Sequence, residues 1–254
     1  MGRFASTVEF YSRYREPYSP GFFPIVAERL GLRGSEKLLD IGCGPGLLAI
    51  GFAPFVGEVT ALDPEASMIA AARAAAAEAG VNISFVHEKL EQFSAASSFD
   101  VVTIGRALHW LDRETALPVL RQIVGDSGRI LVCGASNTDT PEFPWVKLYD
   151  IARRSFTSAG DEKRYRLDNK VWFDGSGFEQ VDTISVAERR EVTNAELIGR
   201  ALSKSSTSPT ALGSRREEFE ARIKAAVEPF ARSGVLQEEI VSRALVFVRQ
   251  TGRT

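Results

Sequence analysis

The sequence of 254 residues contains only two cysteines and two histidines. Cys43 and Cys133 are too few for a disulfide framework. The cysteines and histidines together also lack the spacing of a usual zinc cluster, so we predict no metal site. A chain of this length can bury a substantial core without such cross-links.

Long apolar runs and a basic surplus are absent as well. No run approaches the roughly 20 apolar residues that cross a membrane, and residues 1–18 have no apolar segment typical of a secretory signal. The net charge of -2 and the pI of about 5.9 argue against a nucleic-acid partner, because phosphate contacts dominate that affinity. We therefore expect a cytoplasmic monomer or homodimer with neither nucleic-acid nor membrane partners.

The remaining composition, 44% hydrophobic and 25% charged, is typical of globular proteins. Apolar runs alternate with helical patterns up to Cys133. Strands are predicted at residues 37–41, 58–62, 82–86, 99–104 and 129–133, helices at 46–53, 64–79 and 112–124, and a turn at 125–128. Strands separated by helices imply right-handed crossovers, so we predict an α/β, doubly wound, mostly parallel sheet with helices on both faces.

The second half of the chain is less regular. We predict helices at residues 141–156, 168–176 and 214–230, strands at 178–186 and 243–249, and a charged loop at 160–164. Residues 203–208, SKSSTS, are polar and show no periodicity.

The strongest motif is the glycine-rich turn LLDIGCGPG at residues 38–46. Glycine allows positive φ angles and close approach of a ligand, and the helix that follows presents unpaired N–H groups. Such a turn suits a nucleotide-like or carboxylate-bearing ligand. The dinucleotide fingerprint G-x-G-x-x-G is not met, because Leu47 stands where its third glycine belongs. Asp40 ends the strand, where its carboxylate can reach a cation or an amine.

Asp63 ends the second predicted strand, 23 positions after Asp40. An acidic residue about 20 positions beyond such a turn can accept hydrogen bonds from ribose hydroxyls. Because Pro64 follows, Asp63 is also a good helix N-cap with proline at the first helical position. The two roles can coexist.

Three segments, LLDIGCGPG, VTALDPEASM and FDVVTIGRALHW, together resemble the class I (seven-stranded) S-adenosylmethionine-dependent methyltransferases. Within that family the sequence is most similar to the small-molecule branch that includes trans-aconitate and ubiquinone-biosynthesis methyltransferases. The resemblance covers about residues 11–133 well and the remainder loosely. It implies a Rossmann-like seven-stranded sheet, S-adenosyl-L-methionine as cofactor, S-adenosyl-L-homocysteine as product, and a small-molecule acceptor such as a carboxylate, phenol or amine.

The resemblance also implies individual cofactor contacts. The turn residues line the methionine part, Asp63 holds the ribose, and Pro64 and Met68 flank the adenine, although a methionine on an alanine-rich helix is more often a core residue than a ligand contact. Lys89 departs from the Asp that the family usually has there, which leaves the backbone N–H of Leu90 as the contact to the adenine. The implied cofactor-binding residues are Tyr14, Asp40, Gly42, Cys43, Gly44, Gly46, Asp63, Pro64, Met68, Leu90, Glu91 and Arg106.

The end of the fourth strand and the N-terminus complete this implied site. Residues 104–106 lie beside the methionine moiety in the family. Related proteins fold an N-terminal helix over the cofactor, so Tyr14 or Arg15 is a candidate for its carboxylate, with a surface arginine and a half-buried tyrosine as the alternative.

Transfer of an activated methyl group needs mainly positioning and exclusion of water. A base is required only if the acceptor must lose a proton. His109 is the catalytic candidate, because it follows the fourth strand, where ligands bind in open α/β sheets, and neutral imidazole is a competent base. The alternative is that His109 shapes the pocket, and His87 is a weaker candidate base. Trp110 is predicted as a wall of the acceptor pocket or as core.

Other reactive or charged residues have simpler interpretations. Cys43 is predicted to fill the turn rather than act as a nucleophile, because no base or cation stands beside it, and Cys133 is predicted to be core. The pairs Arg153-Arg154 and Arg189-Arg190 are candidate anchors for an anionic acceptor, or solvated charges.

We predict one domain over residues 1–254. It comprises an N-terminal helical cap at 1–36, a cofactor-binding core at 37–134, and sheet completion with helical lid insertions at 135–254. Specificity is expected in the lid, at 141–166 and 193–230.

Three alternatives stay open. An NAD-dependent oxidoreductase is disfavoured by Leu47 and by the lack of a Tyr-x-x-x-Lys pair. An RNA or protein methyltransferase is the second alternative, and the near-neutral charge weakens its RNA version. Residues 104–110 also lack the Asn/Asp-Pro-Pro-aromatic run of DNA amino-methylation. A non-enzymatic cofactor-binding paralogue would keep the fold without the chemistry.

Overall fold

The computed structural model of the protein describes residue 10, residues 13–158 and residues 168–250. The chain divides into two compact units. The first, called here the core unit, comprises Pro20–Gly134, Arg166–Val186 and Ser242–Thr254. The second, called the helical unit, comprises Met1–Ser19, Ala135–Tyr165 and Ala187–Val241. A single domain over the whole chain stays a prediction.

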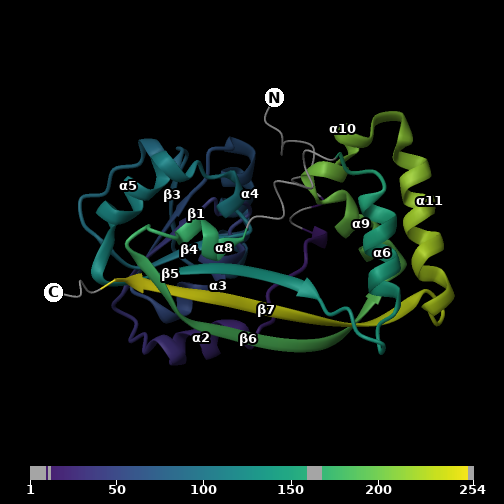
Figure 1. The fold of residues 1–254 in the computed structure, drawn as a ribbon, viewed down its shortest axis with the longest axis horizontal. Helices are drawn as coiled ribbons and strands as arrows, with labels where there is room; N and C mark the ends of the chain where they lie inside the picture. Colours follow the sequence, from purple (N-terminus) through teal and green to yellow (C-terminus); the bar gives the residue numbers. More distant parts are fainter. Residues whose placement is uncertain (1–9, 11–12, 159–167, 251–254) are drawn as a thin grey trace. The chain divides into compact units, whose positions relative to one another are not determined.

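Seven strands form one sheet in the order β3-β2-β1-β4-β5-β7-β6. Their bounds are β1 Lys37–Ile41, β2 Glu58–Leu62, β3 Ser84–Val86, β4 Phe99–Gly105, β5 Val124–Asn137, β6 Phe178–Thr193 and β7 Val235–Arg249. The strands β1 to β5 pair in parallel throughout, and the arrow of β7 runs opposite to that of β5 in Figure 1. The α/β, doubly wound, mostly parallel seven-stranded fold is thus confirmed.

The core unit contains helices between its strands (Figure 1). They are α2 Phe22–Leu30, α3 Leu47–Phe52, α4 Ala66–Ala79, α5 Arg113–Ile123 and α8 Asn169–Phe173, with the short 3-10 helices η1 Ala53–Phe55, η2 Leu90–Gln92 and η3 Leu108–Trp110. The alanine-rich α4 ends where predicted, because Gly80 takes a left-handed conformation and its N–H bonds the last carbonyls of the helix.

The helical unit is built mainly from α6 Trp145–Arg154, α9 Asn194–Leu202 and α11 Arg216–Val227. Shorter pieces connect them: η4 Ser205–Thr207, α10 Pro209–Leu212, η5 Gly213–Arg215 and η6 Glu228–Phe230. Helix α11 packs on both α6 and α9. The unit has its own apolar cluster, to which α6 contributes Trp145 and Tyr149 and α11 contributes Phe219 and Ile223.

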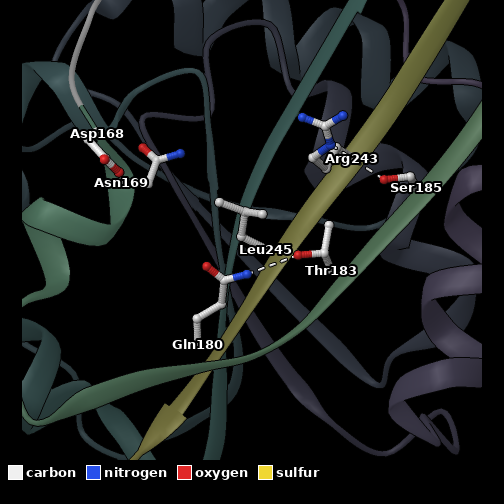
Figure 2. A pocket seen from close by; sticks show the side chains of 7 residues that line it. All are labelled: Asp168, Asn169, Gln180, Thr183, Ser185, Arg243 and Leu245. Carbon is white, nitrogen blue, oxygen red and sulfur yellow. Dashed lines mark hydrogen bonds between the residues drawn. The ribbon is translucent and has the colours of Figure 1, made fainter.

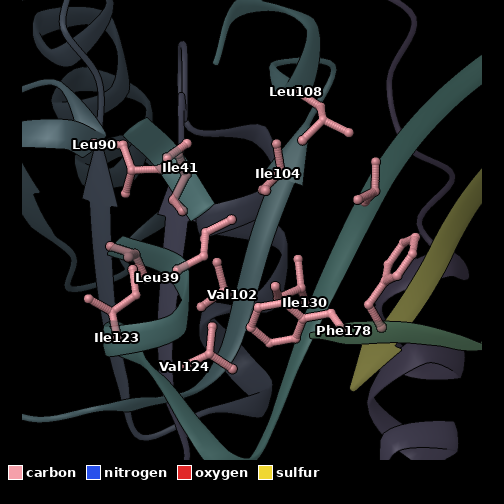
Figure 3. Close-up of a cluster of buried hydrophobic side chains, with 14 of the residues drawn as sticks. Leu39, Ile41, Leu90, Val102, Ile104, Leu108, Ile123, Val124, Ile130 and Phe178 are labelled. Atoms are coloured by element: carbon pink, nitrogen blue, oxygen red, sulfur yellow. The ribbon is translucent and has the colours of Figure 1, made fainter. Parts of the chain in front are cut away.

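One hydrophobic cluster of the core unit packs β1, β4 and β5 against α5. Figure 3 shows side chains from β1, β4 and β5, such as Leu39, Val102 and Ile130, meeting Ile123 at the end of α5. Because β1 and β4 are buried along most of their length, they read in the sequence as continuous apolar runs.

The predicted turn at residues 125–128 lies inside β5 rather than before it. There the register with β4 jumps from Phe99↔Val124 to Val101↔Arg129, so the strand carries extra residues at this point. A Cβ at Gly128 would lie 2.8 Å from the carbonyl oxygen of Phe99 and 2.9 Å from the backbone N and O of Gly125. The chain therefore folds back tightly at these glycines, within an irregular stretch of the strand.

The second half of the chain differs from prediction mainly in strand length and in two missed helices. Strands β6 and β7 are longer than the predicted 178–186 and 243–249. The added residues of β6 alternate mostly between half-buried and exposed, and those of β7 alternate between buried and more exposed. Helices α9 and α10 were not predicted. The predicted charged loop at 160–164 lies outside the described residues. Within the described ranges, no helix is long and apolar enough to cross a membrane.

Candidate functional site

The carboxyl ends of five parallel strands lie at one edge of the sheet. Ile41 pairs with both Leu62 and Ile104, Leu62 pairs with Val86, and β5 continues the register beside β4. The chain leaves β1 toward β2 on one side, whereas β4 lies on its other side. A reversal of strand order of this kind opens a crevice at the carboxyl ends of the strands, where open α/β sheets bind ligands.

The glycine-rich turn after β1 lies at this edge. Gly42, Gly44 and Gly46 have φ angles of 63°, 54° and 86°, so the predicted positive φ angles are confirmed. A Cβ on Gly42 would lie 2.7 Å from the Cβ of Ala107, and one on Gly46 would lie 3.3 Å from the Cβ of Ala72. The backbone of the turn thus packs directly on the segment after β4 and on α4, with no space for side chains.

Asp40 lies near the end of β1, just before this turn. Its side chain is buried, with 1% of the residue exposed. It accepts hydrogen bonds from the hydroxyl of Thr103 at 2.8 Å and from the N–H of Ala49 at 3.2 Å. Burial raises its pKa to about 7, although both hydrogen bonds oppose that shift. Because Ala49 lies in the first turn of α3, Asp40 already uses one of the N–H groups expected to face a ligand.

Asp63 joins the loops that follow β1 and β2. One carboxylate oxygen accepts the N–H of Gly44 and the other accepts the N–H of Glu65, both at 2.9 Å. Burial raises the pKa of Asp63, and the two N–H groups and His87 oppose that shift. Each oxygen keeps a second lone pair for another donor. The predicted N-cap role is wrong, because α4 begins at Ala66 with Glu65 at the N-cap.

His87 follows β3 and bonds to the loop after β2. Its Nε2 lies 3.0 Å from the carbonyl oxygen of Pro64. A carbonyl oxygen only accepts, so Nε2 carries a proton and donates it. His87 therefore holds Pro64 in place, next to the carboxylate of Asp63.

Arg106, His109 and Trp110 follow β4 at the same edge. Arg106 has a φ angle of 56°, which is rare for a residue with a side chain, and its N–H bonds the carbonyl oxygen of Cys133 at 3.1 Å. The rings of His109 and Trp110 have centroids 5.0 Å apart, and both residues are half-buried on η3. The unusual backbone at Arg106 turns the chain from β4 into the segment that carries His109.

Several other predicted residues are buried. Met68 and Leu90 are each 3% exposed, and Leu90 belongs to the hydrophobic cluster of the core unit. Cys43 is buried, and burial, together with the charges of Asp40 and Asp63, raises the pKa of its thiol well above its usual range. A buried, protonated thiol agrees with a space-filling role for Cys43. Pro64 and Glu91 are exposed.

Tyr14 and Arg15 belong to the helical unit. The ring of Tyr14 packs against Gly199 of α9, where a Cβ would overlap it. Their contact with a cofactor stays a prediction.

The arginine pairs of the helical unit bind acidic side chains. Arg153 and Arg154 both bond to Asp150. The exposed Arg189 pairs with Glu142 and Glu239, which agrees with a solvated charge.

Arg190 joins a buried network around Glu238. Glu238 is fully buried and accepts two hydrogen bonds from Arg200, at 2.7 and 2.9 Å. It also accepts from Arg190 and from Asn137. Burial alone would raise the pKa of Glu238, but these partners lower it below its usual value. The network has partners for both carboxylate oxygens and is a structural element of the helical unit.

An open pocket of about 480 Å³ lies elsewhere in the core unit (Figure 2). Side chains of β6 and β7 line it, including Gln180, Thr183 and Arg243, together with Asp168 and Asn169 beside α8. None of the sequence-predicted site residues lines this pocket.

Sequence reasoning missed two residues that shape the site. Thr103 bonds Asp40 from the neighbouring strand, and Ala107 packs against the glycine turn. The signal for Thr103 was a hydroxyl inside the apolar run FDVVTIG. Nothing comparable in the sequence indicates that Ala107 packs against the glycine turn.

Residues 38–126 match the model of a family described as a methyltransferase domain. The ubiquinone biosynthesis O-methyltransferase of Cronobacter sakazakii is 36% identical over 108 residues, which are 41% of this chain and 44% of the relative. The chain thus spans less than half the length of the curated relatives it matches.

Two solved structures with bound S-adenosyl-L-homocysteine share the fold. The SAM-dependent methyltransferase of Thiobacillus denitrificans has a TM-score of 0.57 and 17% identity, covering 98% of this chain and 99% of that chain. The SAM-dependent methyltransferase of Geobacter sulfurreducens has a TM-score of 0.56 and 16% identity, with the same coverage of 98% and 99%. The resemblance to class I S-adenosylmethionine-dependent methyltransferases is thereby confirmed, for the fold and for the matched segment.

Proposed function

We propose that the protein transfers a methyl group from S-adenosyl-L-methionine to a small-molecule acceptor. The observation that carries this proposal is the hydrogen bond from the N–H of Gly44 to Asp63, at 2.9 Å. This bond holds Asp63, an acid suited to ribose hydroxyls, next to the glycine-rich turn, which suits the methionine part of the cofactor. The match of residues 38–126 to a methyltransferase domain supports the same function.

The residues of this edge fit the cofactor. Gly42 and Gly44 are left-handed and half-buried, so they present backbone without side chains, whereas the left-handed Gly46 is buried. Asp63 has two oxygens, each with a lone pair left for a hydroxyl donor. His87 fixes Pro64, which stands next to that acid and is exposed.

The segment after β4 carries the residues proposed to act in the methyl transfer itself. When bound, the cofactor would supply a sulfonium methyl group whose carbon the acceptor attacks, so that the acceptor–carbon bond forms as the C–S bond breaks and S-adenosyl-L-homocysteine leaves. His109 then takes the proton that an O–H or N–H acceptor must lose, and the half-buried Trp110 excludes water beside it. The acceptor classes supported by the resemblance are a carboxylate, a phenol and an amine.

Binding calorimetry tests the cofactor. We expect S-adenosyl-L-homocysteine to bind and NAD not to bind. Asp63→Ala should weaken S-adenosyl-L-homocysteine by about 10- to 100-fold, because each hydrogen bond to a charged group contributes roughly 1.5–3 kcal/mol, part of which water replaces.

Asp112→Ala is the matched control for this experiment. Asp112 also accepts a backbone N–H with its carboxylate, but at the N-cap of α5, so its loss should leave cofactor affinity unchanged. Binding of NAD without binding of S-adenosyl-L-homocysteine would overturn the proposal. An unchanged affinity in Asp63→Ala would remove Asp63 from the site.

Turnover tests the role of His109. In a screen of carboxylates, phenols and amines that follows S-adenosyl-L-homocysteine release, His109→Ala should lower turnover by about 10²- to 10⁴-fold and keep cofactor affinity. His87→Ala should instead weaken cofactor binding and leave turnover at saturating cofactor nearly unchanged, because His87 holds Pro64. Cofactor binding without turnover of any class would favour the non-enzymatic paralogue.

A further inference from the structure

The open pocket on β6 and β7 has no part in the proposed function. Its volume of about 480 Å³ lies in the range of small-molecule sites, roughly 300–1,000 Å³. All the residues that line it belong to the core unit. The pocket is therefore formed within one unit.

One wall of this pocket consists of alternate residues of neighbouring strands. Strand β6 contributes Thr183 and Ser185, and β7 contributes Arg243 and Leu245. The members of each pair are two positions apart, so they share one face of their strand. In Figure 2, Arg243 lies beside Ser185 at one end of the wall. The side chain of Gln180 lies beside Thr183 at the other end.

Arg243 is the cation of this pocket, and it pairs with no acid in the described part of the chain. Its Nε donates to the hydroxyl of Ser185 at 3.4 Å, and its terminal nitrogens make no hydrogen bond to a described residue. The other arginines of these strands differ. Arg190 pairs with Glu238, for example, and the exposed Arg189 pairs with Glu142. The terminal nitrogens of Arg243 thus have the fork of donors that a carboxylate accepts with both oxygens.

The other end of the wall offers hydrogen-bond acceptors instead. The amide nitrogen of Gln180 donates to the hydroxyl of Thr183 at 2.9 Å. The amide oxygen of Gln180 accepts no hydrogen bond from a described residue. Asp168 also lines the pocket, beside α8 (Figure 2). A negative group and an amide oxygen favour a donor with positive charge at this end.

We propose that the pocket binds a small amino acid whose ammonium and carboxylate groups are far apart. The carboxylate bonds to Arg243 and Ser185, the hydrocarbon body packs on Leu245, and the ammonium points toward Asp168. A reversed ligand would place its carboxylate beside Asp168 and its ammonium beside Arg243, so the charges select one orientation.

The spacing of the wall favours an ω-amino acid over an α-amino acid. Thr183 and Ser185, which mark its two ends, lie roughly 7 Å apart, because a strand rises about 3.3 Å per residue. The charged groups of an α-amino acid are attached to one carbon and cannot reach both ends. The site is therefore separate from the one proposed for the cofactor, whose methionine part is an α-amino acid, and the inference goes beyond the proposed function.

Calorimetry with matched probes tests the ligand class. We expect 6-aminohexanoate to bind in the millimolar range. Its isomer 2-aminohexanoate carries the same charges on one carbon and should bind about three- to fivefold more weakly, as should hexanoate, which lacks the ammonium group. Hexylamine lacks the carboxylate and should bind about five- to tenfold more weakly.

Substitutions at the two ends should change different preferences. Arg243→Gln should weaken 6-aminohexanoate about five- to tenfold and abolish its advantage over hexylamine, without lowering the melting temperature, because Arg243 is exposed. Asp168→Asn should abolish the advantage over hexanoate instead. Arg29→Gln is the control, because Arg29 also contacts β6 but is paired with Asp182, and it should change no affinity.

Competition separates this site from the cofactor site. We expect 6-aminohexanoate to bind equally with and without saturating S-adenosyl-L-homocysteine, and competition between them would overturn a separate site. Absence of 6-aminohexanoate binding, equal affinities for the four probes, or affinities unchanged in Arg243→Gln would overturn the site itself. If the probes behave as expected but S-adenosyl-L-homocysteine does not bind, only the proposed function fails.

Discussion

The two units of the chain stabilise buried charge in different ways. In the core unit, Asp40 and Asp63 accept hydrogen bonds from backbone N–H groups and one hydroxyl, with no Lys or Arg bonded to either among the described residues. In the helical unit, Arg200 is paired with Glu238 and Lys204 with Glu16. Burial raises the pKa of Asp40, whereas the arginines lower that of Glu238 although it is buried too.

This difference bears on the proposed function. An acid held by neutral dipoles keeps lone pairs for neutral donors such as ribose hydroxyls. A buried acid such as Glu238, whose two oxygens already accept from Arg190, Arg200 and Asn137, is satisfied within the protein. The buried acids of the core unit are therefore the ones suited to the uncharged part of a nucleoside. Substitutions in the two units should therefore lower stability for different reasons: loss of charge compensation in the helical unit and loss of backbone geometry in the core unit.

The largest effect is expected from breaking the buried ion pair. Arg200→Ala leaves Glu238 buried with fewer cations, so the free energy of unfolding should fall by about 3–5 kcal/mol. Urea denaturation measures this directly. Arg216→Ala is the matched control, since its pair with Glu220 is exposed and exposed pairs contribute roughly 0–1 kcal/mol.

A double variant separates charge from packing. Arg200→Met with Glu238→Leu removes both charges and should recover most of the lost stability, because burying two charges is itself unfavourable. If the double variant were as unstable as Arg200→Ala, the network would contribute packing rather than charge compensation.

In the core unit, backbone geometry rather than charge should be the sensitive feature. Gly42→Ala should cost about 3 kcal/mol, since a left-handed residue costs roughly 1–2 kcal/mol and its Cβ also meets Ala107. Gly80 has nearly the same φ, 67°, but a Cβ there would have nothing within 4 Å. Gly80→Ala should therefore lose only the roughly 1–2 kcal/mol of the left-handed conformation. Equal losses of stability would show that crowding at the turn is absent. Only Gly42→Ala should also lose S-adenosyl-L-homocysteine binding.

Much of the core unit can be predicted from the sequence because its signals are local. The predicted strands at 37–41 and 58–62 coincide with β1 and β2, since each is a short apolar run between turn residues. The positive φ angles of the turn follow from its three glycines. The partner of Asp40 could not be predicted, because Thr103 reaches it through the pairing of β1 with β4.

The helical unit is harder to predict because its partners are distant in sequence. Glu16 lies 188 positions from Lys204, so nothing local indicates that residues 203–208 are buried. Helix α9 did have a local signal, since Thr193 and Glu196 form a capping box before an apolar run. Its omission is a failure of interpretation rather than of information.

The last of these effects is a pH dependence at Asp40, which is small over any one pH unit. Its folded-state pKa, about 7, lies above the ordinary value of 3.8, so the folded protein holds a proton there that the unfolded chain releases. Between those two pH values the wild-type protein should lose stability as pH rises. The side chain of Asp40→Asn does not titrate, and it can still bond to Thr103 and Ala49. Its free energy of unfolding should therefore rise relative to that of the wild type by up to about 1.4 kcal/mol per pH unit. Denaturation at several pH values measures the difference, with the exposed Asp112→Asn as control. A difference independent of pH would mean that the dipoles around Asp40 stabilise its charge as fully as arginines stabilise that of Glu238, and the contrast between the units would fail.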